Sequence, residues 1–68
     1  MRIVVNGDPM EVTSGIPVTE LLSQLKLRSE LVVVELNLNI LKREELALTL
    51  LREKDQLEIV RIVGGGVF

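Results

Sequence analysis

Apolar and polar residues follow a period of two in several short stretches of this chain and a helical period in one. Residues 1–5 form a β-branched run, residues 10–13 alternate apolar and polar, and Asn-Gly-Asp-Pro occupies 6–9 between them. An Asn-Gly turn flanked by such stretches is a strong hairpin signal. We therefore expect the chain to begin with a β-hairpin.

The clearest helical pattern runs from Pro17 to Leu27. Proline is tolerated in the first turn of a helix, because its missing N–H would have no partner there. The apolar positions recur at spacings of three, one and three, which places them on one face. We expect a helix of about three turns with a core-facing stripe of Val18, Leu21, Leu22 and Leu25.

Three further elements are predicted between this helix and the last strand. The apolar run over 32–37 predicts an inner strand buried on both faces, and Asn37 and Asn39 indicate a turn after it. Residues 42–46 predict a single helical turn. Leucine alternates weakly with smaller residues over 46–50, which predicts a short strand.

The last strand is predicted at LEIVRIV, over 57–63, directly before a run of glycines. A period of two buries either Leu57 and Ile59 or the alternate positions, and the sequence leaves this register open. In both registers large aliphatic groups stay exposed unless both faces are covered, and an exposed apolar patch is typical of a contact site. The candidate partner-binding residues are Val60, Arg61 and Ile62.

Together these elements predict an α+β roll of the β-grasp (ubiquitin-like) kind. It has a mixed sheet of four to five strands, with one main helix packed across it. A chain of 68 residues supports one domain. We expect this domain over 1–63, followed by a flexible glycine-rich tail over 64–68.

Composition narrows the function classes. Cysteine and histidine are both absent, which removes the commonest metal ligands and the commonest general base. The net charge is −2 with the signs mixed, so no nucleic-acid surface is indicated. The longest purely apolar run, 31–34, is far shorter than the ~20 residues of a membrane span. We expect a cytoplasmic protein that is not an enzyme and has no membrane partner.

The chain ends with Gly64, Gly65 and Gly66, followed by Val67 and Phe68. Three glycines after a strand do not continue a sheet, because each loses much entropy when ordered. One interpretation of the triplet is a frayed chain terminus without a function. A backbone without Cβ atoms also suits a narrow channel, and three residues reach about 10 Å beyond a fold. The triplet alone leaves both interpretations open.

Five segments of the chain fit one known family: the opening MRIVVNG, the helix start PVTELL, the central VELN and KREE and, most clearly, the closing DQLEIVRIVGGG. Through these segments the whole chain resembles the ThiS family, the sulfur carrier proteins of thiamine biosynthesis. None of these segments is specific alone. Their order, spacing and total length together are.

The resemblance implies a carrier that has no catalytic site and no permanently bound cofactor. An adenylyltransferase of the ubiquitin-activating type uses ATP and Mg²⁺ to adenylate the carboxylate of the last glycine. That residue is Gly66 here, or Gly65 if the tail is shortened further. Sulfur from a cysteine desulfurase persulfide then displaces AMP and leaves a thiocarboxylate. Thiazole synthase takes that sulfur to build the thiazole ring.

One departure from the family concerns the two residues after Gly66. The family ends at glycine, and the Phe68 side chain does not suit a channel shaped for glycine. We therefore expect a processing protease to remove Val67 and Phe68. Alternatively, these residues come from cloning, or the protein has lost the carrier role.

Other functions fit the same sequence. The chain also resembles the small subunit of molybdopterin synthase, and a carrier could serve a different sulfur acceptor. A ubiquitin-like interaction module without sulfur chemistry is the alternative from another class, and the Val67-Phe68 ending favours it.

Overall fold

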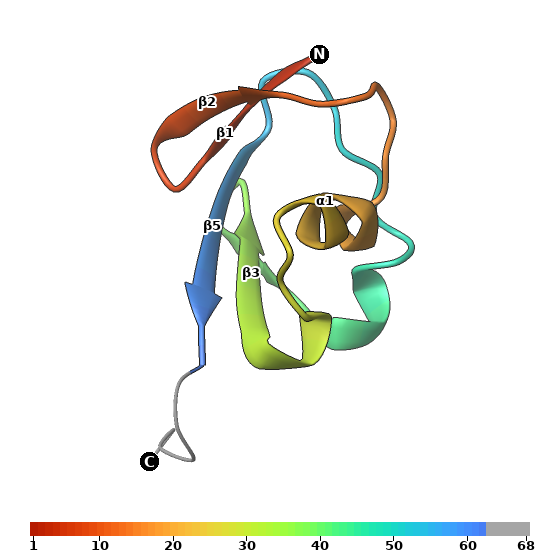
Figure 1. Cartoon of the computed structure of the whole chain (residues 1–68), viewed down its shortest axis with the longest axis vertical. Helices are drawn as coiled ribbons and strands as arrows, with labels where there is room; N and C mark the ends of the chain where they lie inside the picture. The colour runs from red at the N-terminus through yellow and green to blue at the C-terminus, as the bar shows by residue number, and fades with distance from the viewer. Residues whose placement is uncertain (63–68) are drawn as a thin grey trace.

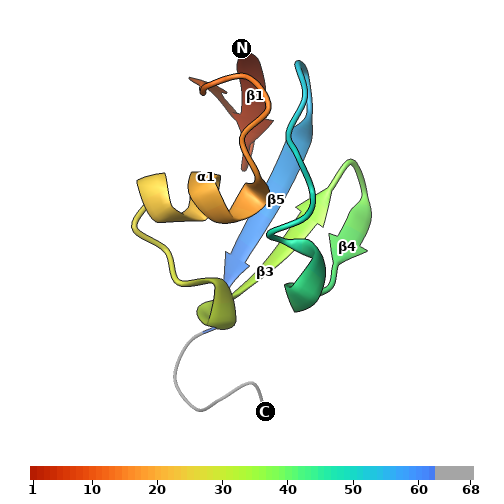
Figure 2. The ribbon, with the colours of Figure 1, turned by 90° about the vertical axis from the view of Figure 1, so that its right-hand side faces the viewer.

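A computed structural model describes residues 1–62. They form a five-stranded mixed sheet in the order β2-β1-β5-β3-β4. One helix, α1, lies on one side of this sheet (Figures 1 and 2). This confirms the predicted architecture, whereas the predicted tail over 64–68 lies outside the described residues. The strands are β1 (Arg2–Val5), β2 (Asp8–Glu11), β3 (Val32–Leu36), β4 (Asn39–Leu41) and β5 (Gln56–Arg61).

The central strand, β5, is the last in sequence. It pairs parallel with β1, where Val5 lies opposite Leu57, and antiparallel with β3, where Val32 lies opposite Arg61. The strand that leads toward the glycines is therefore held by hydrogen bonds on both edges.

The helix α1 (Val18–Gln24) is shorter than predicted because of how it ends. Lys26 takes a left-handed backbone with φ 60°. Its N–H donates to the Ser23 carbonyl at 3.0 Å, and the Leu27 N–H donates to the Leu22 carbonyl at 2.8 Å. This is the Schellman pattern that closes a helix. It stops α1 about one turn before Leu27.

The helix nevertheless buries the predicted stripe. Val18, Leu21 and Leu22 are at most 1% exposed, and Leu25 is half-buried. They pack against the inner residues of the sheet and of the loops beside it. The other fully buried side chains of this core are Ile3, Val34, Leu51 and Leu57.

The short strand predicted over 46–50 is wrong. Leu46 is buried but Leu48 is 80% exposed, so the leucines do not share one face. Instead the segment runs along the start of α1, where the Thr49 carbonyl accepts from the Val18 N–H at 3.0 Å. It thereby satisfies one of the free N–H groups at the helix start, and only an isolated bridge joins Leu50 to Pro17.

The sequence did not predict the fourth strand, β4, which directly follows β3. A tight turn joins the two strands, and Glu35 lies opposite Ile40. The single helical turn predicted over 42–46 is confirmed as the 3₁₀ turn η2 (Arg43–Glu45). A second 3₁₀ turn, η1 (Ser29–Leu31), leads into β3.

The prediction that 32–37 is buried on both faces is also wrong. Val32 and Val34 are buried, but Val33 is 40% exposed. The reason is that α1 covers one face of the sheet, and no helix within residues 1–62 covers the other. We call this uncovered side the outer sheet face.

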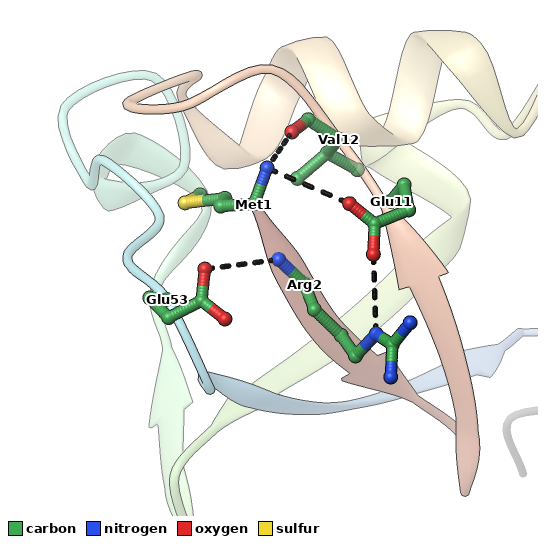
Figure 3. A network of polar contacts seen from close by, with 5 residues as sticks. All are labelled: Met1, Arg2, Glu11, Val12 and Glu53. Atoms are coloured by element: carbon green, nitrogen blue, oxygen red, sulfur yellow. Dashed lines mark hydrogen bonds and ion pairs between the residues drawn. The ribbon is translucent and has the colours of Figure 1, made fainter.

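A polar network holds the start of β1 (Figure 3). The Met1 amino group donates to the Val12 carbonyl at 2.7 Å. The Arg2 side chain donates to the Glu11 carboxylate, and the Arg2 backbone N–H donates to the Glu53 carboxylate, both at 3.1 Å. These contacts tie the β1–β2 hairpin, confirmed as predicted, to the loop that precedes β5.

Candidate functional site

The structure settles the register of β5. Leu57 and Ile59 face α1 and are 1% and 9% exposed, whereas Val60 is 60% exposed. Val60 therefore lies on the outer sheet face, where Val33 of β3 is its direct cross-strand partner. The two valines form an apolar pair on an uncovered surface.

Carboxylates adjoin this apolar pair. Glu35 lies directly opposite Glu58 in the β3–β5 register, and Ile40 of β4 flanks Glu35 on the other side. Like charges directly opposite one another destabilise a sheet. Among residues 1–62, neither carboxylate forms an ion pair. The outer sheet face thus combines apolar groups with negative charge.

The structure does not bring all three predicted contact residues together. Arg61 shares the helix-facing alternation of Leu57 and Ile59, so its side chain lies on the side of the sheet opposite to that of Val60. Ile62 is half-buried, and its N–H donates to the Leu31 carbonyl at 2.8 Å. Val60 belongs to the outer sheet face, whereas Arg61 and Ile62 line a hollow on the helix side.

Sequence reasoning missed two asparagines that position β5. The Asn6 side chain accepts from the Ile59 N–H at 2.7 Å and donates to the Ile59 carbonyl at 3.3 Å. The Asn37 side chain accepts from the Gln56 N–H at 3.0 Å. Each asparagine signalled only a turn in the sequence, because the strand it contacts lies far along the chain.

The predicted site at the chain end, Gly64, Gly65 and Gly66, lies outside the described residues. Residues 1–62 contain no group of three side chains that could hold a metal ion. None of the helices in this part of the chain is long and apolar enough to cross a membrane. What the described chain supplies is a central strand paired on both edges, with two chemically different surfaces beside its end.

Comparison with known proteins gives a consistent result. The model of the ThiS family matches residues 3–66 and thus ends at Gly66. The sulfur carrier protein ThiS of Escherichia coli is 32% identical over 66 residues, which cover 97% of this chain and 100% of that protein. A thiazole synthase of Paramagnetospirillum magneticum is 36% identical over 66 residues. This chain spans about a fifth of its length, since the match covers 20% of it.

Solved structures agree with this assignment. The crystal structure of the thiamine biosynthesis protein ThiS from Geobacter metallireducens superimposes with a TM-score of 0.84 at 42% identity. The match covers 97% of this chain and 100% of that one. It confirms the predicted β-grasp fold. The family model, the full-length relative and the shared structure together establish that this chain belongs to the ThiS family.

Proposed function

We propose that the chain is a sulfur carrier of thiamine biosynthesis, a non-catalytic protein that carries sulfur on the carboxylate of Gly66. The observation that carries this proposal is that the family match ends at Gly66, a few residues after the central strand of the sheet. A bare glycine backbone that follows a strand paired on both edges is suited to entering a partner's active site.

The proposed chemistry has three steps. An adenylyltransferase joins the glycine carboxylate oxygen to the α-phosphorus of ATP, and pyrophosphate leaves. A persulfide sulfur from a cysteine desulfurase then attacks the glycine carbonyl carbon, and AMP leaves. Reductive cleavage of the resulting sulfur–sulfur bond by a thiol leaves the thiocarboxylate. ATP and Mg²⁺ belong to the activating partner, so the carrier needs no acid, base or metal of its own.

Thiazole synthase is the proposed sulfur acceptor. Two proteins named thiazole synthase, from Paramagnetospirillum magneticum and Magnetococcus marinus, each contain a segment 36% identical to this chain. In those proteins a carrier-like segment belongs to the same polypeptide as the named activity. This supports a direct encounter between the present chain and a thiazole synthase.

The outer sheet face is proposed to contact the activating partner through Val60. We expect Val60→Asp to weaken this contact and leave stability almost unchanged, because the side chain is already 60% exposed. Leu48→Asp is the matched control, since Leu48 is 80% exposed on the loop beside α1. Unfolding of Val60→Asp, or equal loss with Leu48→Asp, would contradict this assignment.

Removal of Val67 and Phe68 is part of the proposal, because Gly66 has a free carboxylate only when no residue follows it. The test is intact mass spectrometry after incubation with adenylyltransferase, cysteine desulfurase, cysteine, a thiol reductant, ATP and Mg²⁺. A chain ending at Gly66 should gain the mass of one sulfur in place of one oxygen, and the full-length chain should not. Conversion of the full-length chain with Phe68 retained would refute the processing step.

A ubiquitin-like interaction module remains the competing function, favoured by the two residues after Gly66. A module of this kind would bind its partner equally well after the glycines are removed. A chain ending at Val63 distinguishes the two functions. Undiminished partner binding, together with no thiocarboxylate on the chain ending at Gly66, would support the interaction module.

A further inference from the structure

A hollow of about 340 Å³ lies on the helix side of the sheet, next to the end of β5. We call it the basic hollow. Its cationic residues come from three places: Lys26 follows α1, Arg28 precedes η1, and Arg61 ends β5. Its apolar lining includes Leu27, Leu31 and Ile62.

The basic hollow adjoins the point where the chain continues toward its glycines. Figure 2 shows η1 beside the end of β5. The Ile62 N–H donates to the Leu31 carbonyl at 2.8 Å, so the last described residue is tied to the wall of the hollow. Gly64 follows two residues later in sequence. A protein that receives the glycines therefore approaches the basic hollow closely.

Positive charge dominates this end of the molecule, although the chain as a whole carries −2. Arg28 forms an ion pair with Glu30 at 2.9 Å. Two hydrogen bonds to this carboxylate hold the pKa of Glu30 below its ordinary value. The larger effect comes from the Glu30 backbone N–H and the next from the Arg28 side chain. No ion pair within residues 1–62 involves Lys26 or Arg61. These two cations are available to an external anion.

Lys26 occupies its position at a conformational cost. It is the residue just beyond the helix end, with φ 60°, where glycine is favoured because a Cβ atom crowds the left-handed backbone. A cation also complements the partial negative charge at a helix C-terminus. Lys26 therefore has a structural role, which an experiment must separate from any role in binding. Glycine would relieve the strain, so Lys26→Gly can separate the charge of this residue from its conformational cost.

We propose that the basic hollow docks a cluster of Asp or Glu side chains on the activating protein that receives the glycine tail. The inference rests on the proposed function, because it takes the tail as the group delivered. Apolar residues beside the cations suit the methylene stems of protein side chains better than they suit a free phosphate. The acidic outer sheet face disfavours a nucleic acid, which would be repelled by Glu35 and Glu58.

The test measures the association rate between the full chain and its purified adenylyltransferase at several salt concentrations. Reversing a charge at the rim of an interface mainly changes the association rate and its salt dependence. Arg61→Glu and Lys26→Glu should each slow association about tenfold at low salt and flatten its salt dependence. Arg52→Glu is the matched control, since Arg52 is exposed outside the basic hollow. It should behave as the unaltered chain does.

Lys26→Gly separates charge from structure. It should raise the melting temperature by about 4 °C, because the left-handed strain is relieved. It should nevertheless slow association, and Lys26→Arg should restore the original rate. A stabilised Lys26→Gly chain that associates at the original rate would overturn the proposal.

The remaining outcomes distinguish this inference from the proposed function. If the reversal variants associate like the unaltered chain, the docking proposal fails and the carrier function stands. If the chain ending at Gly66 associates but never forms a thiocarboxylate, the proposed function fails and the docking survives. If inorganic phosphate at constant ionic strength binds the chain through Arg61 but leaves association with the adenylyltransferase unchanged, the hollow binds phosphate, and docking of carboxylates is wrong.

Discussion

The two hairpins of the sheet turn in the same way with different residues. β1 and β2 are joined through Asn6 and Gly7, with φ 51° and 86°. β3 and β4 are joined through Asn37 and Leu38, with φ 49° and 74°. Two consecutive positive φ angles are typical of a type I′ turn, for which Asn-Gly is preferred. Leucine pays a steric cost in that position, and Leu38 is 89% exposed as well.

Both turns begin with an asparagine, and this residue has the same structural role in each. Both asparagines use their side-chain amides to hold the backbone of β5, at Ile59 and at Gln56. Gly7 and Leu38, the second residues of the two turns, both line one hollow on the outer sheet face. The comparison teaches that the asparagine positions the central strand, whereas the next residue differs between the two turns.

The largest expected effect is that of Asn6→Ala. It removes two part-buried hydrogen bonds to Ile59 and places a Cβ-bearing residue without a compensating amide at positive φ. We expect a loss of about 2–4 kcal/mol of unfolding free energy, measured by urea denaturation. Asn6→Asp keeps the acceptor for the Ile59 N–H and should lose less. An unchanged midpoint for Asn6→Ala would show that these bonds do not stabilise β5.

Asn37→Ala should have a smaller effect. Its bond to the Gln56 N–H and its bond to the Asp55 carboxylate are both exposed, so water replaces them at little cost. A loss of about 1–2 kcal/mol is expected in the same urea titration. A loss as large as that of Asn6→Ala would mean that burial does not explain the difference between the two hairpins.

Leu38→Gly should stabilise the protein by about 1 kcal/mol, since it recreates the Asn-Gly turn of the first hairpin. Thermal unfolding should shift upward by roughly 4–8 °C. Leu38→Ala is the control, because alanine removes the exposed side chain but keeps the Cβ atom. If Leu38→Ala stabilises as much as Leu38→Gly, exposure rather than strain limits this turn.

Gly7→Ala is the reverse substitution and should have the smallest effect. A Cβ atom at Gly7 would meet nothing within 4 Å, so only the positive φ opposes it. We expect a loss of about 0.5–1 kcal/mol, measured by thermal and urea unfolding. A loss of several kcal/mol would reveal a steric conflict that the open surroundings of Gly7 do not explain.

The same comparison shows how far the sequence predicts the fold. The first hairpin is predicted because glycine marks the turn, and the helix is predicted because its leucines keep a regular spacing. The turn after β3 is predicted from Asn37 and Asn39, but the second hairpin is missed because β4 has only three residues and Leu38 is not a residue typical of a type I′ turn. The sequence predicts a hairpin only where the residue at the strained position of its turn is also the residue type that the backbone geometry favours.

The candidate site divides in a similar way. Val60 is predicted as a contact residue because both alternations of β5 contain aliphatic groups. Its exposure depends on which side α1 packs, and the sequence of β5 does not contain that information. The basic hollow was not predicted, because Lys26 and Arg61 are distant in sequence and become neighbours only in the folded sheet. The glycine triplet was identified from composition and family resemblance alone.

The central position of β5 also governs when the fold can form during synthesis. β1 and β3 both pair with β5, and sequence-distant pairings of this kind cannot form early in folding. A nascent chain on the ribosome therefore cannot complete the sheet until Arg61 has emerged from the exit tunnel. A truncated product lacking β5 would remain unfolded and open to proteolysis. Completion of the sheet and synthesis of the glycine triplet are therefore almost simultaneous, because only two residues separate Arg61 from Gly64.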